Sequence, residues 1–321
     1  MSPMTLQWKV LVSAPYAMNC LPWYRERLGQ AGCEMVVAPV RERLEENELI
    51  ALLPGMDGLI CGDDRVSDRV LAAAPQLKVI SKWGTGIDSI DQAACRRRGV
   101  VLRNTPNAFS EPVADTVLGY MLLFARNLAA MNGDLQAGEW RKPQSYALRE
   151  WTLGVIGVGN CGKAVVRRAG AFGMRVLGCD PVAPPAAFLR ETGLEMTSLE
   201  DLLHQADAVT LHVDLNPTSL HLINRRSLGA FRPSAYLVNT SRGPAVEEAA
   251  LVEALDRQAL AGAALDVFEQ EPLPSDSRLR HRANVLLAPH NANSSPAAAQ
   301  RVHESTVAHL LEELQARALP A

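Results

Sequence analysis

The sequence has little that would suit a disulfide-stapled, nucleic-acid-binding or membrane-spanning protein. Its 321 residues include six cysteines, but none forms a Cys-x-x-Cys pair or a zinc-like cluster with histidine, so we expect reduced thiols and no metal. Lys and Arg number 32 against 35 Asp and Glu, which excludes a strongly basic surface for nucleic acid or anionic lipid. No apolar run is long enough for a membrane span, and the N-terminus lacks a signal-sequence layout. We therefore expect a cytoplasmic protein whose partner is a small molecule or another protein.

Short apolar runs alternate with helical patterns along the chain. In the first part of the chain the runs are Val10–Val12, Met35–Ala38, Gly58–Cys61, Leu77–Ile80 and Val100–Leu102. A second series comprises Leu153–Ile156, Arg175–Cys179, Ala208–His212, Tyr236–Asn239, Ala263–Val267 and Val285–Ala288. Such strands, alternating with helices, are typical of parallel sheets covered on both faces. The sequence predicts an α/β fold of two doubly wound parallel-sheet domains, Rossmann or flavodoxin-like.

Two helical patterns lie outside these series. Apolar residues spaced three and four apart from Val113 to Leu128 predict one long helix, and Pro106 before it indicates a domain junction. The same spacing from Val302 to Leu314 predicts an amphipathic helix at the end of the chain. We expect this last helix to pack back on the first domain.

A glycine motif directly follows the apolar run that ends at Ile156 and opens a predicted helix. Its residues are Gly157, Val158, Gly159, Asn160, Cys161 and Gly162. In this strand–turn–helix context the glycines make the turn, admit the pyrophosphate and let helix pack on strand. Asp180 ends the next strand, where it can accept the ribose hydroxyls and repel the extra phosphate of NADP. The motif predicts NAD, the simpler alternative being a tight turn plus an unrelated surface aspartate.

Three polar residues follow later strands of the same half. They are Arg242, Glu271 and His290. A guanidinium offers a planar fork for a carboxylate, and a carboxylate beside an imidazole raises the imidazole pKa and fixes its tautomer. Each residue taken alone could be structural, Arg242 as an exposed loop residue and the other two as loop contacts. Together they supply a substrate anchor, an orienting group and an acid/base for hydride transfer to or from an alcohol.

The chain resembles the D-isomer-specific 2-hydroxyacid dehydrogenase family, which includes phosphoglycerate, glyoxylate/hydroxypyruvate and D-lactate dehydrogenases. The motifs that carry the resemblance run through most of the chain in the family's order. They are Lys82-Trp83-Gly84-Thr85-Gly86-Ile87-Asp88, Asn104-Thr105-Pro106, the glycine motif, Thr240-Ser241-Arg242-Gly243, Asp266-Val267-Phe268 with Glu271-Pro272, and Pro289-His290.

This resemblance implies roles for residues that the motifs alone leave open. Arg242, Glu271 and His290 would be the catalytic trio, and Asp266 would accept from the nicotinamide carboxamide. The implied cofactor set is Gly157, Gly159, Asn160, Cys161, Gly162, Asp180, His212, Val213, Thr240 and Asp266. The implied substrate set is Lys82, Trp83, Gly84, Thr85 and Gly86, with the glycine–threonine backbone at the substrate carboxylate.

The resemblance also implies an organisation for the whole chain. A substrate-binding domain would comprise residues 1–104 plus 294–321, and an NAD-binding domain residues 105–293, with the active site in the cleft between them. The helix over about 113–130 would belong to a homodimer interface, although its apolar face could instead be buried within its own domain. The substrate would be a small 2-hydroxy or 2-oxo acid.

Three positions depart from the family pattern and bear on which family member the chain resembles. Asp214 follows His212-Val213 where many members have proline, and Ala292 stands where glycine is common. Cys61 ends a strand where phosphoglycerate dehydrogenases tend to carry arginine, which weakens that assignment, although Lys82 could still meet an anionic substrate tail.

Relatives with other functions share the same scaffold. Formate dehydrogenases carry Gln where Glu271 stands, and phosphite dehydrogenase carries Lys where Thr85 stands. Corepressors keep the fold and its NAD site as dinucleotide-sensing scaffolds but add long tails. We therefore predict an NAD-dependent oxidoreductase that interconverts a D-2-hydroxy acid and its 2-oxo acid.

Overall fold

The structure, a computed structural model, describes residues 7–317, which form two compact units. Unit 1 comprises residues 7–108 and 295–317, and unit 2 comprises residues 109–294. The chain thus leaves unit 1 after Ala108 and returns to it at Ser295. The domain limits expected from the sequence fall four residues earlier at the first junction and one residue earlier at the second, and their outermost parts, 1–6 and 318–321, lie outside the described residues.

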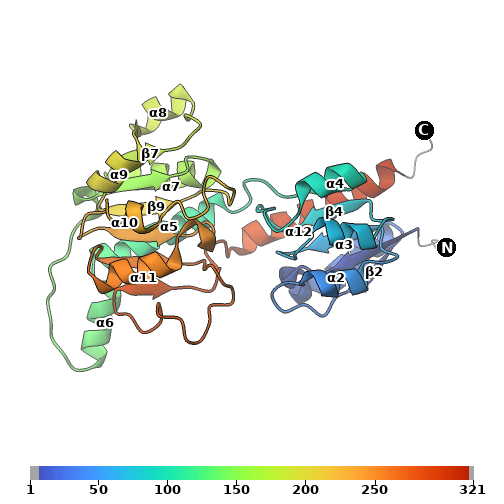
Figure 1. Cartoon of the computed structure of the whole chain (residues 1–321), viewed down its shortest axis with the longest axis horizontal. Helices are drawn as coiled ribbons and strands as arrows, with labels where there is room; N and C mark the ends of the chain where they lie inside the picture. Colours follow the sequence, from blue (N-terminus) through green and yellow to red (C-terminus); the bar gives the residue numbers. More distant parts are fainter. Residues whose placement is uncertain (1–6, 318–321) are drawn as a thin grey trace. The chain divides into compact units, whose positions relative to one another are not determined.

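Unit 1, in which Figure 1 labels β2 and β4, is built on a five-stranded parallel sheet with the strand order β2-β1-β3-β4-β5. The strands are β1 (Trp8–Val12), β2 (Cys33–Val37), β3 (Gly58–Cys61), β4 (Val79–Lys82) and β5 (Val101–Arg103). Every residue of β3 and β4 is buried, as expected for central strands covered on both faces. The order reverses between β1 and β3, and ligands of such sheets bind beyond the carboxyl ends of the strands at this point.

Helices cover both faces of this sheet. They are the short 3₁₀ helix η1 (Pro15–Cys20), α1 (Leu21–Gln30), α2 (Glu46–Leu52), α3 (Asp68–Ala73), α4 (Gln92–Arg98) and α12 (Pro296–Ala316). The C-terminal helix α12 lies against β3 and β4: a Cβ on Gly58 would stand 2.9 Å from Cδ1 of Leu310, and Ser81 Oγ donates to the carbonyl of Thr306 at 2.8 Å. The packing of the last helix on the first part of the chain is therefore confirmed.

Unit 2 contains a seven-stranded sheet with the order β12-β11-β10-β9-β6-β7-β8, and every pairing in it is parallel. The strands are β6 (Thr152–Ile156), β7 (Arg175–Cys179), β8 (Glu195–Met196), β9 (Ala208–Leu211), β10 (Tyr236–Asn239), β11 (Gly262–Leu265) and β12 (Val285–Leu287). The two parallel α/β sheets confirm the predicted fold class. The edge strand β8 is missing from the prediction because its two residues form no apolar run.

The helices of unit 2 pack on both faces of its sheet. They are α5 (Ser110–Ala125), α6 (Leu128–Gln136), η2 (Leu148–Glu150), α7 (Asn160–Ala171), α8 (Ala186–Thr192), α9 (Leu199–Gln205), α10 (Arg225–Leu228), η3 (Gly243–Ala245) and α11 (Glu248–Asp256). One core joins α5 and α7 to β6, and a second joins α9 and α11 to the opposite face. These cores fix the strand ends on which the site is built.

The single long helix predicted over 113–130 is wrong. Helix α5 ends at Ala125, and α6 begins at Leu128 at an angle of 57° to it. Asn127 between them has a φ of +54°, a left-handed conformation that asparagine adopts more readily than most residues, and its amide donates to the carbonyl of Gln144. Apolar spacing does not reveal one such residue. Within residues 7–317 no single helix is long and apolar enough to cross a membrane, and only the bent α5–α6 pair meets that test by length and composition.

Candidate active site

The glycine motif forms the turn between β6 and α7. Gly157 has a φ of +88°, and a Cβ there would lie 2.5 Å from the carbonyl oxygen of His212. A Cβ on Gly162 would lie 2.1 Å from the carbonyl oxygen of Gly157, so α7 can approach the turn this closely only at glycine. Gly159 is the N-cap of α7, whose first N–H groups have no partner within the helix. The turn has the form that suits a pyrophosphate at a helix N-terminus.

Asp180 lies directly after β7 and is tied to this turn. Its Oδ2 accepts the N–H of Val158 at 2.6 Å, and its Oδ1 accepts the N–H of Val182 at 2.7 Å. Each carboxylate oxygen has a further lone pair for a ligand hydroxyl. The carboxylate is therefore held beside the glycine turn, where the family fingerprint requires an acceptor for ribose.

His212 and Val213 follow β9 and face the first glycine through their backbone. The Nε2 atom of His212 lies 3.1 Å from Thr210 Oγ1, and burial lowers the pKa of this histidine to about 4. The imidazole is thus neutral near pH 7. It contributes shape rather than charge to this part of the site.

The remaining predicted cofactor residues of unit 2 lie at the same edge of the sheet. Thr240 follows β10, and its Oγ1 is buried without a hydrogen-bond partner among the described residues, so a ligand could satisfy it. Asn160 begins α7, and Cys161 beside it has its sulfur 3.5 Å from Ser110 Oγ. Burial raises the pKa of the Cys161 thiol, which marks it as a packing residue. The glycine turn, Asp180 and the unsatisfied Thr240 hydroxyl together fit a bound NAD.

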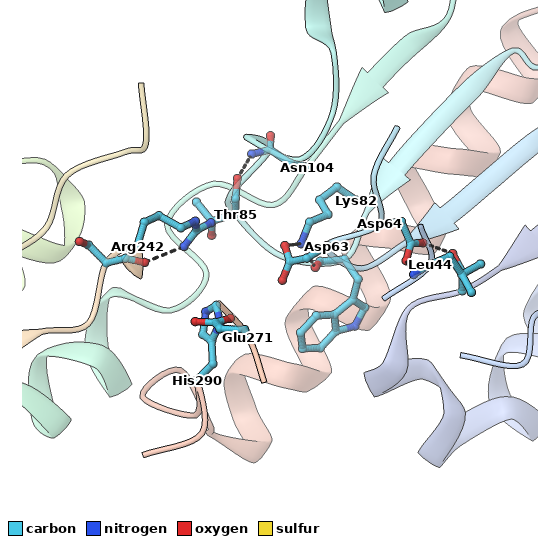
Figure 2. Close-up of polar contacts among 12 residues, drawn as sticks. Leu44, Asp63, Asp64, Lys82, Thr85, Asn104, Arg242, Glu271 and His290 are labelled. Carbon is cyan, nitrogen blue, oxygen red and sulfur yellow. Dashed lines mark hydrogen bonds and ion pairs between the residues drawn. The ribbon is translucent and has the colours of Figure 1, made fainter. Parts of the chain in front are cut away.

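Glu271 and His290 come from separate loops and lie side by side (Figure 2). His290 Nδ1 is 2.8 Å from Glu271 Oε2, and Glu271 Oε1 accepts the N–H of Phe268 at 2.9 Å. The backbone therefore orients the carboxylate, and the carboxylate orients the imidazole with Nε2 on the side of the ring away from Glu271. Both side chains keep some exposure, 23% for Glu271 and 30% for His290, so a substrate can reach the pair.

Asp266 holds the loop that carries His290. It directly follows β11, is 1% exposed, and accepts the N–H groups of Asn291 and Ala292 on its two oxygens, each at 2.8 Å. Its own carbonyl accepts the N–H of His290 at 2.7 Å. His290 has a φ of +49°, which is unfavourable for a residue with a Cβ, and these three bonds hold it there. The contact of Asp266 with the nicotinamide carboxamide stays a prediction.

Arg242 lies in a loop wrapped around a buried amide. Asn239, which is fully buried at the end of β10, accepts from Ser241 through Oδ1 and donates from Nδ2 to the carbonyl of Arg242 at 2.9 Å. One guanidinium nitrogen of Arg242 donates to the carbonyl of Ser241 at 2.8 Å (Figure 2). A Cβ on Gly243 would lie 1.9 Å from the backbone of Phe268, so the arginine loop and the Glu271 loop touch at this glycine.

The expected substrate loop of unit 1 follows β4. Gly84 has a φ of +117°, and its carbonyl accepts the N–H of Thr105 at 2.9 Å. Thr85 donates its hydroxyl to the carbonyl of Thr105 at 2.9 Å, and the amide of Asn104 donates to the carbonyl of Thr85 (Figure 2). The segment at Asn104 and Thr105 therefore braces the backbone at Gly84 and Thr85.

The side chains of Lys82 and Trp83 point into unit 1. Lys82 is 5% exposed, and Trp83, which is 3% exposed, donates its indole N–H to His303 Nδ1 at 2.8 Å. The indole also stacks on Tyr16 at 4.3 Å between ring centroids. The Lys82 and Trp83 side chains thus support the loop from beneath, and substrate binding by the backbone of the Gly84–Gly86 loop stays a prediction.

Comparison with known proteins identifies the scaffold. Residues 118–292 match the family described as D-isomer specific 2-hydroxyacid dehydrogenase, NAD binding domain. The chain belongs to this family. It is 35% identical over 297 residues to a glyoxylate reductase of Thermofilum pendens, an alignment that covers 90% of this chain and 88% of that protein. It is 37% identical over 275 residues to a D-3-phosphoglycerate dehydrogenase of Methanocaldococcus jannaschii, covering 84% of this chain but 52% of that protein.

Solved structures agree with the family. A D-lactate dehydrogenase from Aquifex aeolicus, complexed with NAD and lactic acid, matches with a TM-score of 0.84 and 27% identity over 96% of this chain and 98% of that chain. The family, the NAD-binding domain and the enzymatic character predicted from the motifs are confirmed: this 2-hydroxyacid dehydrogenase acts on CH–OH donors with NAD. Because these relatives are named for three different acids, the choice of acid must come from this chain's own residues.

A second His–Glu pair in this dehydrogenase escaped the sequence analysis. His221 Nε2 lies 2.7 Å from Glu269 Oε1, two residues before Glu271, and the His221 N–H donates to the carbonyl of Pro244 at 2.8 Å. His221 therefore links the segment after Arg242 to the loop of Glu271. No motif marks it, because its partners are distant in the sequence.

Proposed function

We propose that this protein interconverts a D-2-hydroxy acid and its 2-oxo acid, with His290 as acid/base, Glu271 as its orienting partner and Arg242 as substrate anchor. The observation that carries the proposal is the 2.8 Å contact between His290 and Glu271, on the same sheet edge as a glycine turn that fits NAD. A carboxylate-bound imidazole is the group that an alcohol needs to lose its proton.

In the oxidative direction His290 takes the hydroxyl proton of the 2-hydroxy acid on Nε2 as the C2–H bond breaks. Bound NAD⁺ supplies the acceptor for the hydride. Glu271 stabilises the imidazolium that results, while its second oxygen stays fixed to the N–H of Phe268. In the reverse direction His290 returns the proton to the carbonyl oxygen. Before the next oxidative turnover His290 must therefore release its proton to solvent, and NADH must be exchanged for NAD⁺.

Arg242 supplies positive charge for the substrate carboxylate and for the oxygen at C2. A guanidinium can hold both through its planar fork, which a lysine cannot. The buried amide of Asn239 supports this role, because it fixes the backbone from Ser241 to Arg242. We assign the N–H groups of the Gly84–Gly86 loop to binding a substrate carboxylate, and the bracing of Gly84 and Thr85 by Asn104 and Thr105 supports that assignment.

A homodimer is part of the same proposal. Helix α6 has no buried residue, and the segment from it onward exposes Leu128 at 46%, Leu135 at 56% and Trp140 at 78%. Large apolar side chains gathered on one segment are typical of a protein–protein contact, and the family resemblance points to a second copy. Light scattering should give twice the chain mass for the wild type and a lower mass for Leu135→Asp. A cytoplasmic location stays a prediction.

The decisive experiment follows NADH absorbance with glyoxylate, pyruvate, hydroxypyruvate and related 2-oxo acids. We expect turnover with at least one of them, and loss of turnover but not of NADH fluorescence binding in His290→Ala. An enzyme that binds NADH yet reduces no 2-oxo acid would overturn the proposal in favour of a dinucleotide-sensing scaffold. A parallel assay with NAD⁺ and phosphite tests the phosphite-type alternative.

A further inference from the structure

An ion pair between a buried lysine and an exposed aspartate lies at the start of the expected substrate loop of unit 1. Lys82 Nζ is 3.1 Å from Asp63 Oδ1 and donates to the carbonyl of Trp83 at 3.0 Å (Figure 2). The lysine side chain is 6% exposed, whereas that of Asp63 is 51% exposed. The ammonium is therefore covered, and the group that reaches solvent from this pair is the carboxylate.

The pair stands at the carboxyl ends of two neighbouring strands. Asp63 follows β3, Lys82 ends β4, and the N–H of Trp83 donates to the carbonyl of Cys61 at 2.9 Å where the strands end. The Gly84–Gly86 loop begins two residues after Lys82. Asp63 and Lys82 therefore lie at the strand ends from which this loop starts.

The negative and positive side chains at the carboxyl ends of β3 and β4 are equal in number. Asp64, next to Asp63, is fully buried, accepts the N–H of Leu44 at 2.7 Å and is hydrogen-bonded to Ser13. Burial raises the pKa of Asp64 to about 6, so it is mostly ionised at neutral pH. Segment 61–66 contains one basic residue, the exposed Arg65. Two carboxylates against Arg65 and Lys82 leave no surplus positive charge.

This balance determines which substituent a 2-oxo acid can carry beyond its carbonyl carbon. A second anionic group, such as a phosphate or a distal carboxylate, could bind Lys82 only by displacing Asp63. That would place two negative charges beside one ammonium, which is electrostatically unfavourable. A hydrogen, methyl or hydroxymethyl substituent meets no such cost.

We propose that Asp63 is a specificity-determining residue that selects small 2-oxo acids with a single negative charge, such as glyoxylate, pyruvate and hydroxypyruvate, over 2-oxo acids that carry a second anion. The proposal rests on the proposed function. It assigns Lys82 to holding Asp63 and the Trp83 carbonyl rather than to binding a substrate phosphate.

The test compares two substrates that differ by one phosphate. Wild-type kcat/KM for hydroxypyruvate should exceed that for 3-phosphohydroxypyruvate by about 100-fold or more. The kcat/KM for pyruvate should likewise exceed that for oxaloacetate, which carries a second carboxylate. Asp63→Asn removes the charge and keeps the shape. It should raise kcat/KM for 3-phosphohydroxypyruvate by about 10-fold while that for hydroxypyruvate changes by less than about 3-fold.

The chain offers a matched control. Asp57 forms the same kind of ion pair with Lys78 at the opposite ends of the same two strands, so Asp57→Asn removes an equivalent charge away from the loop. It should leave the substrate ratio unchanged. Raised salt should lower the wild-type ratio of kcat/KM for hydroxypyruvate to kcat/KM for 3-phosphohydroxypyruvate. It should have little effect on the same ratio in Asp63→Asn, because salt screens the charge that the variant lacks.

Three results overturn the inference. Wild-type enzyme that uses 3-phosphohydroxypyruvate as well as hydroxypyruvate contradicts it and leaves the proposed function standing. If Asp63→Asn loses kcat/KM to the same extent with both substrates, Asp63 has only a structural role. Asp63→Ser, which also removes the charge, should then show the same equal losses. No turnover with any 2-oxo acid contradicts the proposed function and this inference together.

Discussion

His290 Nδ1 and Glu271 Oε2 lie 2.8 Å apart, and the other oxygen of the same carboxylate is bound to the N–H of Phe268. The carboxylate cannot turn away from the imidazole without giving up its backbone partner. The bonds from Asp266 hold the histidine backbone independently. Both members of the pair are thus fixed by the protein itself, and in the proposed mechanism this limits the reorganisation needed during proton transfer.

Replacing Glu271 by Gln should change the pH profile. Reduction of a 2-oxo acid needs protonated His290, and the charge of Glu271 stabilises that form. The rate should therefore fall as pH rises, and in Glu271→Gln it should fall at lower pH, by about one pH unit for each 1.36 kcal/mol of lost stabilisation. Rates measured from about pH 5 to about pH 9 test this, and superimposable profiles would remove Glu271 from the mechanism.

His290→Ala should remove that pH limb and cost about 100-fold to 10,000-fold in kcat. His204, which lies 4.0 Å from Glu200 on the exposed surface of α9, is the matched control, and His204→Ala should leave rate and profile unchanged. A His290→Ala variant that retains most of the wild-type kcat would exclude this histidine as the acid/base.

Arg242→Lys should be nearly as damaging as Arg242→Ala. An ammonium keeps the charge but cannot reproduce the two-point fork of a guanidinium. Both kcat and the KM for the 2-oxo acid should worsen, while NADH binding followed by fluorescence should change little. A lysine variant close to wild-type efficiency would show that Arg242 is not the anchor.

Asp180 should give NAD at least a 10-fold advantage over NADP in kcat/KM. Its carboxylate is pinned beside the glycine turn by Val158 and Val182, so it cannot move far from an added 2′-phosphate. Asp180→Ala should lose affinity for NAD more than for NADP. Equal efficiency of the wild type with both cofactors would contradict this role.

Asp64 should make the fold less stable as pH rises. Burial raises its pKa to about 6, above the ordinary value near 4, so the folded state holds the proton more tightly than the unfolded state. Its stabilising contribution is complete below about pH 4 and is lost as pH rises through about 6, a change of about 3 kcal/mol in the free energy of unfolding. Asp64→Asn should therefore gain stability relative to wild type between about pH 4 and pH 8 in urea unfolding. If the free energies of unfolding of the two proteins change with pH in parallel, Asp64 does not have this effect.

The fold could be predicted, and so could the placing of Glu271 and His290 at one edge of the sheet, because both depend on signals local to each strand end. Glu271 and His290 each follow an apolar run, and parallel strands bring their carboxyl ends to one edge. The environment of Lys82 could not be predicted, since it depends on Asp63 from another strand. The burial of Trp83 likewise depends on His303 from the last helix. A left-handed residue such as Asn127 leaves no trace in apolar spacing either.

The position of α12 sets an order for the protein's synthesis. Unit 2 is inserted between two parts of unit 1. Residues 109–294 therefore leave the ribosome before α12, the helix that packs on Gly58 and Ser81. The strands of unit 1 are therefore made first, but the apolar surface that Leu310 covers is buried only after all of residues 109–294 have been made. The nascent chain must carry that surface through the folding of the other unit, so a premature stop codon within α12 would damage the part of the protein made earliest.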